Sequence, residues 1–171
     1  MSKIVFFCIP AYGHTNPTLG VVRELVARGH EVRYYSYEPM RPLIESAGAQ
    51  FVACDPYDCE QRLTPADGAR VGKDIAFSTH ILVETTLALD EFVCADMRAF
   101  APDCIVADSM AVWGKAVAKK LGIPFVSSTT TFAFNRFSAK VIGQNGAGFL
   151  QFLLAQPRIN RQLKRLRAAG Y

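Results

Sequence analysis

Short apolar runs alternate with helix-forming segments along the first half of the chain, and this alternation limits the possible folds. The run at residues 4–9 (IVFFCI) has no polar alternation, which is typical of a parallel strand covered on both faces. Residues 30–37, rich in β-branched and aromatic side chains, and residues 49–54 predict two further strands. Helical patterns at 17–28 and 41–47 lie between the strands, and each is followed by a glycine. This order predicts an α/β fold with a parallel sheet and right-handed crossovers.

The second half of the chain continues the pattern. Residues 73–100 have a helical pattern in which we expect a break, and residues 110–121 predict a helix that ends at a glycine. Two more strands are expected at residues 103–107 and 123–127. The charged, proline-containing stretch at 55–72 is expected to form a long surface loop, a kind of segment that is often functional inside a compact domain.

Length and composition fit one globular domain, so we treat residues 1–171 as a single unit. Half of the residues are hydrophobic and a fifth are charged, which excludes a disordered chain. The five cysteines form no C-x-x-C pair, which favours reduced thiols in a cytoplasmic protein. No apolar run approaches the roughly 20 residues that span a bilayer, and no signal peptide is recognised. We therefore expect no stable membrane insertion.

The net charge of +4 comes from one end of the chain. Five of the 19 basic residues lie between residues 158 and 167, where there is no acidic residue, and the rest of the chain carries 14 basic and 15 acidic residues. A body this close to neutral argues against nucleic-acid binding. The basic stretch predicts the solvated face of a helix, with a phosphate-bearing partner or a membrane surface as the alternative.

Two polar residues are expected at the ends of neighbouring strands. In an open parallel sheet, ligands bind beyond the carboxyl ends of the strands, at the point where the strand order reverses. The first strand leads into Gly13-His14, and the fourth ends at Asp108-Ser109. We therefore expect His14 and Asp108 to approach each other at the edge of one crevice.

A histidine in this position can act as a general base. An imidazole is largely neutral at pH 7, and a carboxylate on one ring nitrogen leaves the other nitrogen free to accept a proton. Asn16 as N-cap and Pro17 as the first helical residue would place His14 just before a helix, whose positive end disfavours early protonation. No serine or cysteine is evident as a nucleophile, so the group to be deprotonated would be a substrate hydroxyl. The alternative is structural, with His14 bonded to backbone and Asp108 capping the next helix.

Two segments resemble the N-terminal half of UDP-dependent glycosyltransferases of family 1, in particular the macrolide-type, YjiC-like branch. They are residues 9–19 (IPAYGHTNPTL) and 102–127 (PDCIVADSMAVWGKAVAKKLGIPFVS), and the likeness is thin between 55 and 100. It implies a Rossmann-like, three-layer domain corresponding to the N-terminal half of a GT-B fold. It also implies an inverting sugar transfer to a hydroxyl of a small hydrophobic acceptor, such as a macrolide or flavonoid, with His14 as base and Asp108 as its partner.

The chain departs from this family in its length. Members are much longer and bind the UDP-sugar through a C-terminal domain whose H-C-G-containing segment has no counterpart here. The resemblance therefore implies an acceptor-binding domain that needs a donor domain, in the same chain or in another, and that transfers little sugar alone. The UDP-sugar would be a co-substrate, and we expect no other cofactor and no metal.

Nine residues on the crevice side are candidates for binding the acceptor, because such pockets are mostly apolar with a few polar anchors. They are Tyr12, Gly13, Asn16, Phe77, Met110, Trp113, Thr131, Phe132 and Phe134. The alternative for each aromatic residue is a place in the ordinary core. Ser127, Ser128 and Thr129 follow the fifth strand and are candidates for contacting a donor phosphate, with ordinary turn residues as the alternative.

Two other functions stay open at this stage. A dinucleotide-binding domain would share the fold and could use Glu38 on a ribose, but the chain has only Gly13 and Gly20 where G-x-G-x-x-G is needed. A non-catalytic half that recruits a catalytic partner would instead use an exposed apolar strip along the crevice and the basic C-terminal helix.

Overall fold

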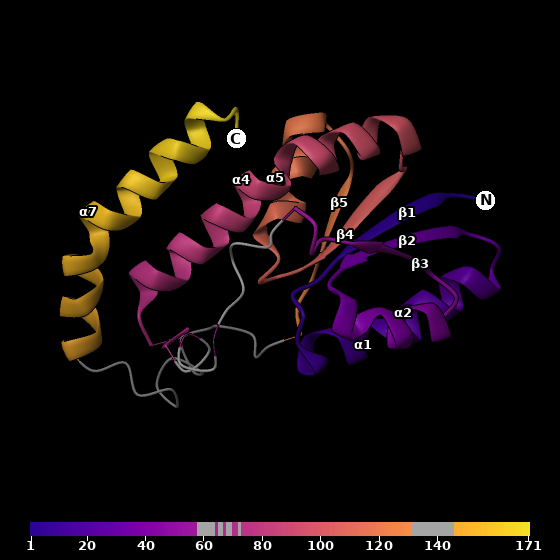
Figure 1. Cartoon of the computed structure of the whole chain (residues 1–171), viewed down its shortest axis with the longest axis horizontal. Helices are drawn as coiled ribbons and strands as arrows, with labels where there is room; N and C mark the ends of the chain where they lie inside the picture. The colour runs from indigo at the N-terminus through magenta and orange to yellow at the C-terminus, as the bar shows by residue number, and fades with distance from the viewer. Residues whose placement is uncertain (58–63, 65–66, 68–69, 72, 131–145) are drawn as a thin grey trace.

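A computed structural model of the protein describes residues 1–57, 64, 67, 70–71, 73–130 and 146–171. Its centre is a parallel five-stranded sheet in the order β3-β2-β1-β4-β5 (Figure 1). The strands are β1 (Lys3–Phe7), β2 (Glu31–Ser36), β3 (Gln50–Ala53), β4 (Cys104–Asp108) and β5 (Phe125–Ser128). The predicted α/β class and the predicted neighbours β1 and β4 are confirmed.

Helices cover both faces of the sheet and give the predicted three layers. Figure 1 shows α1 (Tyr12–Ala27) and α2 (Arg41–Ser46) below the sheet and α5 (Val112–Leu121) above it, where α4 (Ile75–Phe100) also packs. A short 3₁₀ helix, η1 (Glu38–Met40), leads into α2. Along β1, Ile4 and Phe6 pack into the layer of α1 and α2, whereas Val5 and Phe7 pack into the layer of α4 and α5. Burial on both faces explains why this strand is apolar without alternation.

Helix α1 begins earlier than the sequence predicts. Its N-cap is Ala11, whose carbonyl accepts the backbone N–H groups of His14 and Thr15. Asn16 is therefore not the N-cap, and Pro17 lies in the second turn instead of at the first helical position. A proline there cannot donate to the carbonyl four residues before it, and the exposed first turn leaves that carbonyl open to water. His14 consequently lies inside the first turn of α1, not before it.

Helix α4 runs for 26 residues without the break that we expected. No glycine or proline occurs between Ile75 and Phe100, so nothing in the sequence interrupts the backbone hydrogen bonds. At its start the carboxylate of Asp74 accepts the N–H of Phe77 at 3.0 Å, and at its end Ala101 adopts a left-handed conformation. Both ends of α4 are therefore capped, which is consistent with a single long helix.

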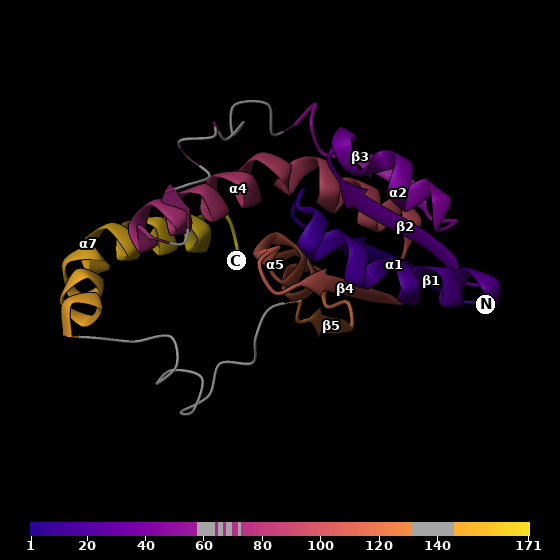
Figure 2. The same ribbon diagram turned by 90° about the horizontal axis from the view of Figure 1, so that it is seen from below.

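The basic C-terminal segment forms one helix, α7 (Gly146–Ala168), which lies beside α4 away from the sheet (Figure 2). Gln162 bonds His80 at 3.1 Å and Arg165 pairs with Glu84, so one side of α7 is fixed to α4. Leu154, nearer the start of α7, is largely exposed. No helix in the described part of the chain combines the length and the apolar character needed to cross a bilayer.

Gly114 tests how closely α5 packs on the sheet. A Cβ at this position would lie 2.6 Å from the Cβ of Ala107 and 2.9 Å from a ring carbon of Phe7, closer than van der Waals contact allows. We expect Gly114→Ala to lower the free energy of unfolding by about 1–3 kcal/mol, measured by urea denaturation. In the control variant Gly20→Ala the new Cβ has no other atom within 4 Å. Its free energy of unfolding should stay the same or rise by about 0.5–1 kcal/mol. Equal stability of the two variants would contradict the close packing.

Candidate functional site

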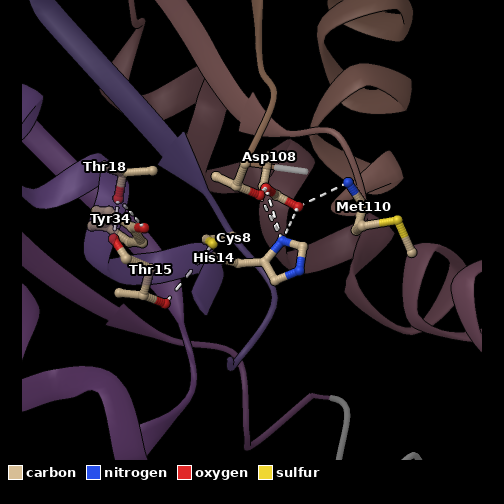
Figure 3. A network of polar contacts seen from close by, with 8 residues as sticks. Cys8, His14, Thr15, Thr18, Tyr34, Asp108 and Met110 are labelled. Atoms are coloured by element: carbon tan, nitrogen blue, oxygen red, sulfur yellow. Dashed lines mark hydrogen bonds and ion pairs between the residues drawn. The ribbon is translucent and has the colours of Figure 1, made fainter. Parts of the chain in front are cut away.

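His14 and Asp108 meet at the carboxyl edge of the sheet, as the strand order predicts. Phe7 is the last residue of β1 and pairs with Ala107, and Asp108 is the last residue of β4. The Nδ1 atom of His14 lies 3.1 Å from Oδ1 and 3.0 Å from Oδ2 of Asp108 (Figure 3). One contact therefore joins the first turn of α1 to the last residue of β4, 94 positions away in the sequence.

The carboxylate of Asp108 is fully buried and has three partners. Its side chain is 0% exposed. Besides the contact with His14, Oδ1 accepts the backbone N–H of Met110 at 2.8 Å, and Oδ2 accepts the hydroxyl of Thr130. Buried charges need such partners, because an uncompensated one is strongly destabilising. Asp108 thus caps the start of the next segment and holds His14 at the same time.

The ring of His14 is held on one edge and open on the other. Its side chain is 20% exposed, and the ring edge opposite Nδ1 faces away from Asp108 (Figure 3). A proton on Nδ1 leaves the lone pair of the neutral imidazole on Nε2. The arrangement can therefore accept a proton at Nε2 while the carboxylate stabilises the imidazolium that forms.

A buried network below the site anchors α1 to the sheet. The hydroxyl of Thr18 lies 2.7 Å from the hydroxyl of Tyr34 and donates to the carbonyl of Thr15, whose own hydroxyl points to the thiol of Cys8 (Figure 3). Burial raises the pKa of the Cys8 thiol to about 11 and also raises the pKa of Tyr34. These neutral groups fix the first turns of α1, which carry His14.

An apolar cavity of about 850 Å³ lies next to the pair. It is bounded by the segments that follow β1 to β4 and by one face of α4. Its lining residues are Ile9, Pro10, Ala11, Tyr37, Glu38, Pro39, Asp55, Val71, Ser78, Ile81, Leu82, Thr85, Met110 and Trp113. His14 and Asp108 do not line it, but Ala11 and Met110 do, and their backbones bond directly to His14 and Asp108. The pair thus lies at the edge of the cavity.

The predicted acceptor residues divide into three groups. Met110 and Trp113 line the cavity, and Trp113 is only 3% exposed. Tyr12, Gly13 and Asn16 do not line it, because the early start of α1 turns them to the surface, where Tyr12 is 60% exposed. Phe77 also lies outside the lining, because the helical period of α4 presents positions 78, 81, 82 and 85 to the cavity. The guanidinium of Arg70 covers the ring of Phe77 instead, at 4.2 Å. Thr131, Phe132 and Phe134 lie outside the described residues.

The residues after β5 lie at the same edge of the sheet. Ser127 and Thr129 are exposed, and the carbonyl of Ser128 accepts the N–H of Ser109 at 2.9 Å. Our sequence analysis missed Thr130, the residue that reaches the His14–Asp108 pair. A signal was available, because Ser128 is the partner of Asp108 in the strand register, and Thr130 lies two positions further on the same side.

Sequence analysis also missed most of the cavity lining. We expected the crevice between β1 and β4, whereas the cavity extends over the ends of β2 and β3 as well. Tyr37, Glu38 and Asp55 come directly after those two strands, so their position at the carboxyl edge was the available signal. Within the described ranges, no three His, Cys, Asp or Glu side chains are grouped as a metal site.

The relatives of this chain are glycosyltransferases. It is 36% identical over 145 residues to demethyllactenocin mycarosyltransferase of Streptomyces fradiae, a match that covers 79% of this chain and 31% of that protein. It is 31% identical over 130 residues to NDP-glycosyltransferase YjiC of Bacillus subtilis, covering 74% of this chain and 31% of the relative. The chain is homologous to YjiC-like and macrolide glycosyltransferases. It spans about a third of the length of these curated relatives. No protein-family model matches it.

Solved structures of GT-B glycosyltransferases share this fold. The glycosyltransferase of kitacinnamycin aligns with a TM-score of 0.69 at 22% identity, over 96% of this chain and 38% of that one. The glycosyltransferase SnogD of Streptomyces nogalater aligns with a TM-score of 0.63 at 20% identity, over 97% of this chain and 39% of that one. This likeness of fold confirms the Rossmann-like domain that the resemblance implies.

The raised pKa of Cys8 predicts a pH dependence of stability. An unfolded thiol loses its proton near pH 8.5, whereas the folded thiol keeps it up to about pH 11. Between these values the unfolded state binds fewer protons, so the free energy of unfolding falls as pH rises. Between pH 8 and pH 10 we expect the Cys8 thiol to lower the free energy of unfolding, measured by urea denaturation, by about 1–2 kcal/mol. Cys8→Ala should have a shallower slope, and an unchanged slope would contradict burial of this thiol.

Proposed function

We propose that this chain is the acceptor-binding domain of an inverting glycosyltransferase that moves a sugar from a UDP-sugar to a hydroxyl of a small hydrophobic acceptor. One observation carries the proposal: the His14–Asp108 pair lies at the edge of an apolar cavity in a homologue of glycosyltransferases. His14 Nε2 takes the proton of the acceptor hydroxyl. The oxygen then attacks the anomeric carbon, the bond to the UDP oxygen breaks, and UDP leaves from the opposite face. Asp108 stabilises the imidazolium.

The size and lining of the cavity support a polycyclic or macrocyclic acceptor. A volume of about 850 Å³ is in the range of sites for drug-sized ligands, and the lining is mainly aliphatic and aromatic. Glu38 and Asp55 lie in this lining and give it polar anchors. A macrolide or a flavonoid fits this description, with one hydroxyl directed to His14.

In this proposal a second domain binds the UDP-sugar donor. The chain spans 31% of its curated relatives, so the rest of the transferase machinery is expected on another segment or chain. Ser127, Ser128 and Thr129 stay candidates for a phosphate contact, because they lie at the edge of the sheet that holds the pair. In this proposal the protein is cytoplasmic, the UDP-sugar is a co-substrate, and the domain alone transfers little sugar.

Acceptor binding can be tested with Trp113, the one tryptophan of the chain and part of the cavity lining. We expect macrolides or flavonoids to cause a saturable change in its fluorescence, because a bound ring system replaces water next to the indole. Ile81→Glu introduces a charge into the same lining and should weaken this binding about tenfold or more. A varied acceptor panel without any saturable change would refute the acceptor assignment.

The role of His14 can be tested by sugar transfer. In a protein that joins this domain to a UDP-sugar-binding domain, we expect His14→Asn to lower kcat at least about 100-fold, the usual range for loss of a general base. Acceptor binding, followed by Trp113 fluorescence, should change little. His80→Asn is the matched control, since His80 bonds Gln162 on α7 and lies outside the cavity lining. Full turnover by His14→Asn would show that another group is the base.

A further inference from the structure

The hydroxyl of Thr130 completes a triangle with the two members of the pair. It lies 2.8 Å from Nδ1 of His14 and within hydrogen-bond distance of Oδ2 of Asp108. Thr130 comes from the segment after β5, whereas His14 lies in the first turn of α1 and Asp108 is the last residue of β4. Three separate parts of the chain therefore meet at one point.

The number of hydrogens on these three groups determines which hydrogen bonds they can form. An ionised carboxylate only accepts hydrogen bonds, and a threonine hydroxyl has one hydrogen to give. If Nδ1 of His14 had no hydrogen, its lone pair would face both oxygens of Asp108, and Thr130 could serve only one acceptor. With a hydrogen on Nδ1, Thr130 donates to Oδ2 while Nδ1–H donates to Asp108 and to the free lone pair of Thr130. The second arrangement makes every close contact favourable.

We propose that Thr130 is a positioning residue that selects the Nδ1–H tautomer of His14 together with Asp108. It acts in two ways, because it fixes the orientation of the carboxylate through Oδ2 and presents a second acceptor to Nδ1–H. Nε2 then keeps its lone pair in the neutral ring. This inference rests on the proposed function for its purpose, since only a base needs a bare Nε2, but the tautomer itself is a property of the domain without any ligand.

The test uses nitrogen NMR of the histidine rings in the 171-residue chain near pH 8. The chain has three histidines, and His14→Asn identifies the signals of His14 by their disappearance. We expect the native protein to show His14 mainly with the proton on Nδ1. In Thr130→Val, which keeps the shape but loses the hydroxyl, the ratio of Nδ1–H to Nε2–H should fall about fivefold, the factor that one hydrogen bond is worth.

Two controls separate positioning from general damage. Thr130→Ser keeps the hydroxyl and should restore the ratio to within about twofold of the native value. Thr79→Val removes a hydroxyl that bonds the carbonyl of Ile75 on α4, away from the pair, and should leave the ratio unchanged. If Thr130→Val does not fold, Thr130→Ala, which also lacks the hydroxyl, takes its place.

Each possible result either supports or overturns the proposal. A lower ratio in the valine or alanine variant that serine restores supports the proposal. A native ratio in the variants without the hydroxyl overturns it, as does a native protein with the proton on Nε2. Because no sugar or acceptor is present, loss of this inference leaves the acceptor assignment open, and failure of acceptor binding leaves the tautomer result intact.

Discussion

The contact between the imidazole of His14 and the buried carboxylate of Asp108 is the interaction on which the site depends. A carboxyl group that is 0% exposed needs hydrogen-bond partners, and here the backbone of Met110, the hydroxyl of Thr130 and the ring of His14 provide them. Removing one partner therefore weakens both the local fold and the orientation of the ring. The same few atoms therefore determine both the stability of this region and the orientation of the His14 ring.

The sheet topology makes this contact possible. The order β3-β2-β1-β4-β5 puts the reversal point between β1 and β4, so both residues emerge at one edge. Helix α1 is held by the buried hydroxyls of Thr15, Thr18 and Tyr34, which fix the turn that carries His14. The unbroken helix α4 then closes the cavity over the same edge, next to the pair. Each layer of the fold contributes to the geometry of the site.

The sequence was sufficient for the fold class, the strand neighbours and the His14–Asp108 pair, because these follow from hydrophobic runs and from rules on parallel sheets. It was insufficient for the start of α1, since Asn16-Pro17 is a strong local start signal that the backbone caps at Ala11 overrode. Phe77 lies outside the cavity lining, because aromatic character does not reveal which face of a helix meets a cavity. Thr130 was missed because its partners lie in α1 and at the end of β4, and only the strand register connects it to Asp108.

The most direct measurement is a crystal structure of the domain with a bound acceptor that changes the Trp113 fluorescence. We expect the body of the acceptor between α4 and the ends of the strands, with one hydroxyl oxygen about 3 Å from Nε2 of His14, and with the His14–Asp108 contact unchanged. An acceptor bound elsewhere, or one whose hydroxyls all face away from His14, would contradict the account.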